Sequence, residues 1–296
     1  MPAARKRRDS IALVGTGNLA AVLGPALRAA GYRIEEVVSR PLPKSQRRAR
    51  RLAKKLRAKA VILADAALAS KVVWLCHTDD AIAQTALQLS PRSGWRGRIV
   101  FHSSGALTSD VLAPLKRAGA HVASLHPMMT FVPGTSPGMK GVTFAVEGDR
   151  KAVSEARAIV RALKAEIFAI RKEAKVLYHA LGSFSSPLLV AELATAERVA
   201  RAAGLKAKQT RKVIGPILQQ TLNNYLRHGA AKAYGGPMKR GDVNTVRRHL
   251  RELKKAPGAG EVYRALVKSA LLDLPAKNKK ELLQLVTQRE AGLENA

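Results

Sequence analysis

The chain has 296 residues, of which 47% are hydrophobic and 25% are charged. This length favours two domains, and the hydrophobic content is sufficient for packed cores, which argues against intrinsic disorder. Apolar runs never approach the roughly 18 residues of a transmembrane helix, and the short one after the basic N-terminus is too brief for a signal peptide. The single cysteine, Cys76, cannot form an internal disulfide, so we expect a cytoplasmic protein without membrane contact.

The charge of the chain is its most unusual bulk property. Lys and Arg number 52 against 21 Asp and Glu, which gives a formal net charge of +31. Three explanations are open: nucleic-acid binding, a site for a phosphorylated cofactor or substrate, and a basic surface without a specific partner. The basic residues are spread along the chain, and aromatic residues that could stack on bases are only 4%. We therefore expect no specific nucleic-acid partner.

The first half of the chain alternates short apolar runs with helical patterns. Strands are expected at residues 10–14, 33–38, 60–63, 71–76, 98–102, 121–125 and 142–147. Helices or helical turns are expected between them, at residues 20–30, 44–59, 66–70, 79–89 and 109–118. Strands that alternate with helices predict an α/β fold with a doubly wound parallel sheet, the Rossmann type.

The pattern becomes helical after Gly148-Asp149. Helices are expected at residues 151–164, 171–203, 207–228, 242–254 and 259–270 and again after 277, with one possible short strand at 166–170. Pro187 should bend or break the long helix, because its ring removes a backbone donor. We accordingly predict a sheet domain over residues 1–148 and a mostly α-helical domain over residues 149–296.

A glycine-rich turn, Gly15-x-Gly17-x-x-Ala20, joins the first expected strand to the first helix. At this position Gly15 permits a tight turn, Gly17 lets the backbone approach a pyrophosphate, and Ala20 allows close packing of helix on strand. The alternative is a glycine-rich turn without a ligand. The residues expected to contact the pyrophosphate are Gly15, Thr16, Gly17, Asn18 and Leu19, the last two through backbone N–H groups.

The end of the second expected strand indicates which dinucleotide is bound. Sites for NAD place a carboxylate there for the ribose 2′-hydroxyl, whereas this chain has Ser39-Arg40. A serine and an arginine are suited to a 2′-phosphate, so we predict NADP as the cofactor. Glu35 and Glu36 precede the strand end and are interpreted as surface residues. The basic helix that starts at Lys44 either deepens the positive potential or is a solvated face.

Polar residues follow three further strands where ligands bind in open α/β sheets. They are His77-Thr78-Asp79-Asp80, His102-Ser103-Ser104-Gly105 and Ser124-Leu-His126-Pro127. Thr78, Asp79, Ser103 and Ser104 are further candidate cofactor contacts, although Asp79 could instead cap the next helix.

His102 and His126 are candidate proton donors to a carbonyl or imine, because histidine titrates near neutral pH; the alternative is a structural histidine in a loop. Metal-ligand spacings such as HxxxH or CxxC do not occur, so we expect no metal site. A Ser–His hydrolase is conceivable from Ser103, Ser104 and His126, but the sequence has no GxSxG turn.

These motifs together resemble the Rossmann-like NADP oxidoreductases whose C-terminal half is a helical domain of unknown function. That family is related to pyrroline-5-carboxylate reductase, ketopantoate reductase and 6-phosphogluconate dehydrogenase, and some members are described as deazaflavin-dependent NADP oxidoreductases. The resemblance runs nearly end to end. The motifs that carry it are Val14-Gly-Thr-Gly-Asn-Leu-Ala20, His77-Thr-Asp-Asp-Ala-Ile82, Phe101-His-Ser-Ser-Gly-Ala106, Ser124-Leu-His-Pro-Met128, Tyr178-His-Ala180, Gly236-Pro237 and Arg240-Gly-Asp242 with His249.

The resemblance implies NADP(H) binding and a homodimer built through the helical domains, but it implies no particular substrate. Related dehydrogenases use a lysine and an asparagine on the helix that here carries Lys175. Where the family pattern has the asparagine, this chain has Ser186-Pro187, which puts a lysine–asparagine mechanism in doubt.

Lys175, Tyr178 and His179 are three and four residues apart, so they can share one face of a helix. Lys175 and His179 join His126 and His102 as candidate catalytic residues, with a solvent-exposed face as the alternative. Arg240 is a candidate contact for an acidic substrate group, although the segment around it could serve only turn and capping roles, with Asp242 as the N-cap.

The leading hypothesis is an NADP(H)-dependent oxidoreductase that transfers a hydride to or from a small carbonyl or imine. A second is an NADP-binding sensor or scaffold protein without turnover, which the missing asparagine would suit. A third is a polyanion-binding basic protein that uses the +31 charge.

Overall fold

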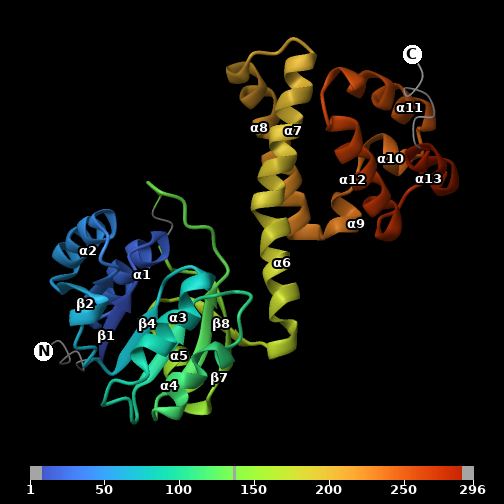
Figure 1. The fold of residues 1–296 in the computed structure, drawn as a ribbon. Helices are drawn as coiled ribbons and strands as arrows, with labels where there is room; N and C mark the ends of the chain where they lie inside the picture. Colours follow the sequence, from blue (N-terminus) through green and yellow to red (C-terminus); the bar gives the residue numbers. More distant parts are fainter. Residues whose placement is uncertain (1–8, 136–137, 289–296) are drawn as a thin grey trace, which may run out of the picture. The chain divides into compact units, whose positions relative to one another are not determined.

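The protein is described here by a computed structural model that covers residues 9–135 and 138–288. The chain divides into two compact units, Met1–Phe184 and Ser185–Ala296, which we call the sheet unit and the helical unit (Figure 1). None of the described helices is both long and apolar enough to cross a membrane.

The sheet unit is built on one eight-stranded sheet with the order β3-β2-β1-β4-β5-β6-β7-β8. The strands are β1 (Ser10–Val14), β2 (Arg33–Ser39), β3 (Lys59–Ile62), β4 (Val72–Leu75), β5 (Ile99–His102), β6 (His121–Pro127), β7 (Thr143–Gly148) and β8 (Glu166–Ala169). Neighbouring strands pair in parallel, except that β7 runs antiparallel to β6. The predicted doubly wound sheet is confirmed, with one antiparallel step near its edge.

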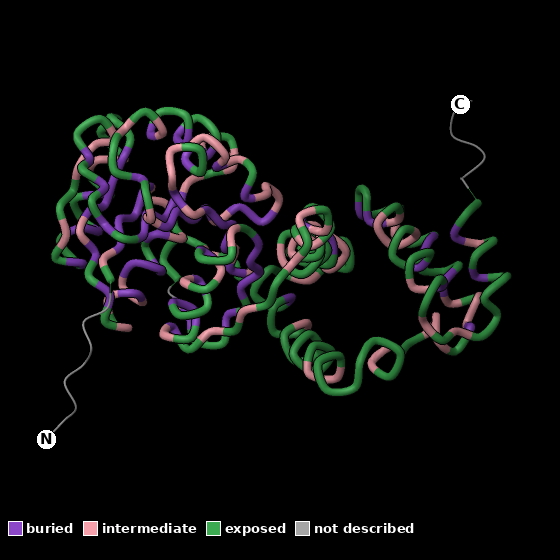
Figure 2. The backbone as a smooth tube through the Cα atoms, turned by 90° about the horizontal axis from the view of Figure 1, so that it is seen from below, coloured by how far each residue is buried: buried purple, intermediate pink, exposed green. Residues whose placement is uncertain are grey.

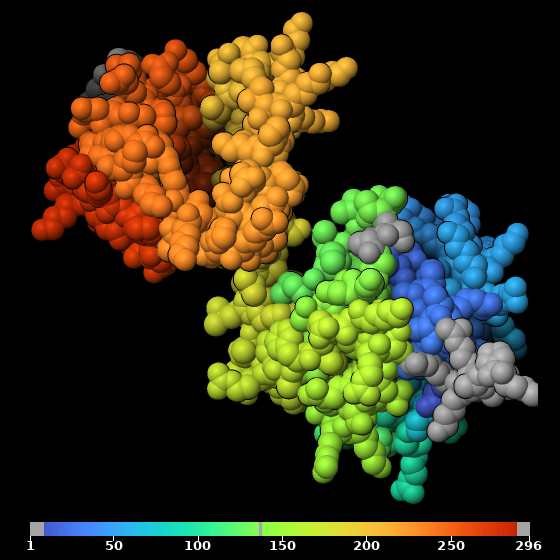
Figure 3. All heavy atoms as spheres, turned by 180° about the vertical axis from the view of Figure 1, so that it is seen from behind, coloured from blue at the N-terminus to red at the C-terminus, as the bar shows by residue number. Residues whose placement is uncertain are grey.

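Helices cover both faces of this sheet because side chains alternate along the strands. In β1, Ile11 and Leu13 face a core shared with α1 (Asn18–Ala29), α2 (Pro43–Leu56) and α5 (Arg150–Ala162). Ala12 and Val14 face the opposite core, which α3 (Asp79–Leu89) and α4 (Ala113–Arg117) complete. Figure 3 shows the first of these faces, with the N-terminal part in blue beside the yellow-green segment that contains α5.

Short 3-10 segments complete the sheet unit. They are η1 (Leu63–Asp65), η2 (Ser109–Leu112) and η3 (Lys172–Ala174). The helical turn expected at 66–70 is instead a loop, and the helix expected at 109–118 is split into η2 and α4.

The boundary between the units lies at Phe184/Ser185 and not at the expected Gly148/Asp149. The helical pattern after Asp149 is real, but the apolar face of α5 packs on the sheet, with Ala156 and Ile159 fully buried. β8 then extends the sheet beside β7. A helix that returns to a sheet has the same periodicity as one in a helical domain, so the sequence pattern could not locate this boundary.

The expected helix at 171–203 is broken at Ser186 into α6 (Lys175–Ser185) and α7 (Pro187–Ala202). Pro187 is the first residue of α7, a position where no backbone N–H is needed. The break predicted from Pro187 is therefore confirmed.

The helical unit continues with α8 (Ala207–His228), α9 (Ala230–Ala233), α10 (Gly236–Arg240), α11 (Val243–Glu252), η4 (Leu253–Lys255), α12 (Ala259–Asp273) and α13 (Lys279–Thr287). Its core is small and consists of Val246, Leu250, Val267, Leu271, Leu282 and Val286. The short helices α9 and α10 were not expected, because turn residues such as Gly235, Gly236 and Pro237 dominate that segment.

Many apolar side chains of α6, α7 and α8 lie exposed in the single chain, and Figure 2 shows these helices mainly in green and pink. On α6, Leu177 is 78% exposed, and on α8, Leu226 is 71% exposed. Thr210 is the buried residue of α8, a helix of 22 residues. Val213, Ile217, Leu222 and Leu226 recur at helical spacing on α8 and are all exposed. An apolar helix face of this kind is normally packed against another element, and the single chain leaves it uncovered.

Candidate nucleotide and catalytic site

A cavity of about 400 Å³ lies where β1, β2 and β4 end in the sheet unit. The predicted residues Gly15 to Leu19, Ser39, Arg40, Thr78 and Ser103 all line it. Gly15 has a φ of +118°, and a Cβ there would lie 2.9 Å from the backbone carbonyl carbon and oxygen of Cys76. Only glycine fits this turn, which leaves the backbone of the loop open to a ligand.

Two predicted residues at the end of β2 line the cavity, and so do two residues of α2 that were not predicted as contacts. Ser39 is buried, and its Oγ has no hydrogen-bond partner. Arg40 follows it, and Ser45 and Arg48 reach the same cavity from the first turns of α2. Arg48 belongs to the basic helix for which the sequence allowed two interpretations, a contribution to the site and a solvated face. The sequence could have pointed to Arg48 because it lies one turn after Ser45, on a helix that begins directly after the loop that follows β2.

The two glutamates before Ser39 are not both surface residues, as the sequence had suggested. Glu36 is 7% exposed, and its carboxylate accepts hydrogen bonds from the backbone N–H groups of Ala67 and Leu68. Its two partners lie in the loop after η1, where exposed backbone donors need an acceptor. Glu36 therefore anchors that loop and does not line the cavity.

His77 also lines the cavity, although the sequence gave it no role beyond the polar loop that contains it. Burial and the nearby Arg40 guanidinium lower the pKa of His77 to about 4. Its ring is therefore neutral at pH 7, and Nδ1 is buried without a hydrogen-bond partner.

Two predicted cofactor residues do not line this cavity. Asp79 begins α3, where a carboxylate favours the positive end of the helix dipole. Ser104 is buried, and its Oγ accepts hydrogen bonds from the backbone N–H groups of Ala106 and Leu107. The geometry thus gives both residues structural roles.

His102, a predicted proton donor, is fully buried at the end of β5. Its Nε2 lies 3.1 Å from the carbonyl oxygen of Thr108, and its Nδ1 accepts a hydrogen bond from the backbone N–H of Ser104. These two partners fix the neutral tautomer with the proton on Nε2. Burial and Lys175 lower the pKa of His102 to about 3. With both nitrogens engaged, His102 orders its loop and does not face a substrate.

Lys175 begins α6 and is also fully buried. Its ammonium donates to the carbonyl oxygen of Ser104 at 3.2 Å and to Oγ of Ser124 at 2.8 Å. Burial lowers the pKa of Lys175, and the carboxylates of Glu147 and Asp79 oppose that shift. The ammonium therefore joins α6 to the ends of β5 and β6, and the geometry makes Lys175 a positioning residue and not a proton donor.

Two more predicted residues, His126 of β6 and His179 of α6, form a cluster with Tyr178 of α6. Nδ1 of His126 lies 3.1 Å from the hydroxyl of Tyr178, and the ring of His179 stands edge-on to that of His126 at 5.9 Å. A Cβ on Gly105 would lie 2.6 Å from Cδ2 of His179 and 2.9 Å from Nε2 of His126. The bare backbone of Gly105 is what allows these two rings to approach the β5 loop.

The electrostatics of this cluster keep His126 and Tyr178 uncharged. Burial, together with Lys175 and His179, lowers the pKa of His126 to about 4. Burial raises the pKa of Tyr178 to about 12. At neutral pH the pair therefore consists of an imidazole and a phenol, of which the phenol is the stronger proton donor to a basic atom. Tyr178 was noted in the sequence only as a neighbour of His179.

Arg240, the predicted contact for an acidic substrate, belongs to the helical unit. Its guanidinium pairs with Asp242 at 2.8 Å, in the turn that leads into α11. Asp242 is at the predicted N-cap position of α11, but its side chain makes no capping hydrogen bond. Its carboxylate pairs with Arg240 instead. In the described residues no group of three or more His, Cys, Asp and Glu side chains could hold a metal ion.

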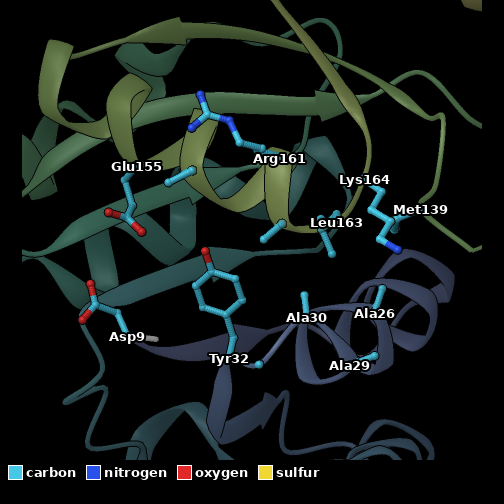
Figure 4. Close-up of a pocket in the computed structure, with 13 residues that line it drawn as sticks. Asp9, Ala26, Ala29, Ala30, Tyr32, Met139, Glu155, Arg161, Leu163 and Lys164 are labelled. Atoms are coloured by element: carbon cyan, nitrogen blue, oxygen red, sulfur yellow. The ribbon is translucent and has the colours of Figure 1, made fainter. Parts of the chain in front are cut away.

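A second cavity, of about 1120 Å³, lies between α1 and α5 and is shown in Figure 4. Alanines of both helices line it, and the carboxylates of Asp9 and Glu155 lie near the Tyr32 ring. Burial and the charge of Asp9 raise the pKa of Glu155. None of the glycine loop or the histidine cluster reaches this cavity, so it is separate from the nucleotide site.

Comparisons with known proteins match this architecture. Residues 2–127 match the Rossmann-like domain, and residues 142–270 match a domain of unknown function, DUF2520. No curated protein sequence matches the chain.

Three solved structures resemble the chain over most of its length. One is a Bacteroides fragilis protein with the provisional name NADP oxidoreductase, with 25% identity, a TM-score of 0.74, and 89% of this chain and 98% of that chain covered. Another is a Thermotoga maritima protein with 25% identity, a TM-score of 0.68, and 94% and 100% covered. The third is an imine reductase from Myxococcus stipitatus in complex with NADP+, with 16% identity, a TM-score of 0.67, and 94% and 100% covered.

Proposed function

We propose that this chain, which belongs to the proteins that join a Rossmann-like domain to a DUF2520 domain, is an NADP(H)-dependent oxidoreductase acting on a small carbonyl or imine. The observation that carries the proposal is the pairing of a nucleotide cavity with the His126–Tyr178 cluster in one unit. The names of two structural neighbours, an NADP oxidoreductase and an imine reductase bound to NADP+, support it.

The residues of the cavity fit a dinucleotide with a 2′-phosphate. Gly15 provides a turn that a Cβ would block, and the N-terminus of α1 offers backbone N–H groups to a pyrophosphate. The buried Oγ of Ser39 lacks a partner, which a ribose or phosphate oxygen would supply. Arg40 and Arg48 reach the cavity beside it. Guanidinium groups suit a phosphate, whereas NAD sites carry a carboxylate here.

The bound cofactor supplies or accepts the hydride, and the protein must move one proton. In the direction of imine reduction, the Tyr178 hydroxyl donates its proton to the substrate nitrogen. The resulting phenolate takes its proton back from water. The neutral His126 ring, whose Nδ1 lies 3.1 Å away, holds the oxygen in place by a hydrogen bond. His179 borders the same space, and Lys175 holds the loop after β5 and strand β6 together beside it.

The cofactor part of the proposal is tested with Arg40→Gln and Arg48→Gln. Each variant should weaken NADPH binding about tenfold or more and leave NADH binding unchanged, because a hydrogen bond from a charged group contributes about 1.5–3 kcal/mol. Both side chains are exposed, so folding should be unaffected. The measurement is calorimetric titration at one fixed salt concentration, since the chain's +31 charge attracts any anion.

Arg47→Gln is the matched control. It removes the same charge from an exposed position of the same helix, but Arg47 does not line the cavity. An equal loss of NADPH affinity in all three variants would mean that only the general field of α2 matters, and would contradict a specific 2′-phosphate contact.

The proton-transfer part is tested with Tyr178→Phe. General acid catalysis typically contributes about 10²–10⁴-fold, so kcat for reduction of a small cyclic imine should fall by about that factor while the NADPH dissociation constant stays constant. Tyr225→Phe, at an exposed tyrosine of α8, is the control for the same chemical change. Unchanged turnover in Tyr178→Phe would refute the role of the hydroxyl. A wild-type protein that binds NADPH without turning over any imine or ketone would instead be a sensor or scaffold.

The exposed apolar residues of α8 support a homodimer built through the helical regions. These side chains are exposed in the single chain, and contact with a second copy of the chain would bury them. Ile217→Asp and Leu226→Asp should therefore give a monomer in sedimentation equilibrium, because each places a carboxylate in an apolar contact. Leu87→Asp, at an exposed leucine of α3, is the control and should leave the dimer intact. A wild-type monomer at micromolar concentration would exclude the dimer.

A further inference from the structure

His77 occupies a particular place in the nucleotide cavity, directly after β4. It lies between the two features that define the cavity, the Gly15 turn and Arg40. Its Cδ2 would be 3.2 Å from a Cβ on Gly15, and its ring is close enough to Arg40 for their charges to interact. The proposed mechanism does not use this imidazole.

The polar atoms of this ring are incompletely satisfied by the protein. Nδ1 is buried and has no hydrogen-bond partner. Oγ of Ser39, which lines the same cavity, is also buried without one. A buried polar atom without a partner costs free energy, so its persistence calls for an explanation. Two such atoms in one cavity indicate that a polar ligand group completes both.

The charges around His77 explain why the ring is neutral without a ligand. The charged side chains that share the cavity are those of Arg40, from the end of β2, and Arg48, from α2. The other polar side chains that line it, Thr16, Asn18, Ser39, Ser45, Thr78, Thr85 and Ser103, carry no charge. Burial keeps the adjacent Cys76 a thiol, because it raises the pKa of Cys76 far above its usual range. A proton on His77 would thus meet positive charge and no carboxylate.

A ligand with a phosphate reverses this balance. A phosphate monoester brings close to two negative charges and three strong acceptors. Placed beside Arg40, it would stabilise the protonated His77 ring. Without the phosphate, the positive charges of the two arginines disfavour that protonated ring. The same dinucleotide without the phosphate brings no such charge to this end of the cavity.

We infer that His77 is a contact for the adenosine-phosphate end of the nucleotide and takes up a proton from water when a 2′-phosphate binds beside Arg40. The inference rests on the proposed nucleotide site and adds a proton to it. The His77 proton then makes the binding of NADP(H) stronger at low pH than it would be in a chain without this imidazole, and it raises the preference for NADP(H) over NAD(H) in the same way. The binding of NAD(H) carries no such proton.

The experiment measures protons exchanged on binding. The full chain is titrated with NADPH and with NADH near pH 6 in two buffers of different ionisation enthalpy, as wild type and as His77→Gln. Glutamine retains a hydrogen-bonding group but cannot titrate. Wild type should take up about half a proton more with NADPH than His77→Gln does, and the two should not differ with NADH. Ionisation of the phosphate itself releases protons near this pH, so it cannot imitate the uptake.

The outcomes separate this inference from the proposed function. Equal proton numbers for wild type and His77→Gln, with NADPH still bound, would refute the role of His77 and leave the nucleotide site standing. No NADPH binding by wild type would overturn both. If His77→Gln does not fold, the histidine proton resonances of the wild type decide the matter. One of the seven histidines should titrate at higher pH with NADPH than with NADH, and no such resonance would refute the inference.

Discussion

The ammonium of Lys175 is fully buried at the carboxyl ends of β5 and β6, and much of the site depends on it. A buried charge is costly unless hydrogen bonds satisfy it. Here the carbonyl oxygen of Ser104 and the hydroxyl of Ser124 do so, and they thereby fix the start of α6 against the loop after β5 and against β6. The following turn of α6 carries Tyr178 and His179, so the same contacts set these side chains beside His126.

A second constraint is the absence of charge on three histidines of the site. The chain as a whole is strongly basic, yet His77, His102 and His126 all have pKa values lowered to about 3–4 by burial and by neighbouring cations. Neutral rings can accept hydrogen bonds, as His102 does from Ser104. They also leave Arg40 and Arg48 as the fixed positive groups of the nucleotide cavity. Two of the chain's many positive charges thus line the nucleotide cavity, and the proton-transfer pair stays uncharged.

The sequence predicted the sheet and the nucleotide loop well, because both depend on local patterns. Short apolar stretches marked strands of four to seven residues, and the position of Gly15 between a strand and a helix is specific. It predicted the His102 and Lys175 roles poorly. Whether a histidine faces a substrate or a carbonyl such as that of Thr108 is decided by long-range packing. The same reason explains Glu36, whose partners at Ala67 and Leu68 are 31 and 32 residues away.

The central claim is that a dinucleotide binds to the loops at the ends of β1 and β4 in the sheet unit. Hydrogen exchange of the full chain, measured by mass spectrometry with and without NADPH, tests it most directly. The account predicts slower exchange in peptides that cover Gly15–Ala20 and His77–Asp79, since a bound nucleotide shields the open backbone donors of these loops. Unchanged exchange in both peptides, or protection confined to the helical unit, would contradict the account.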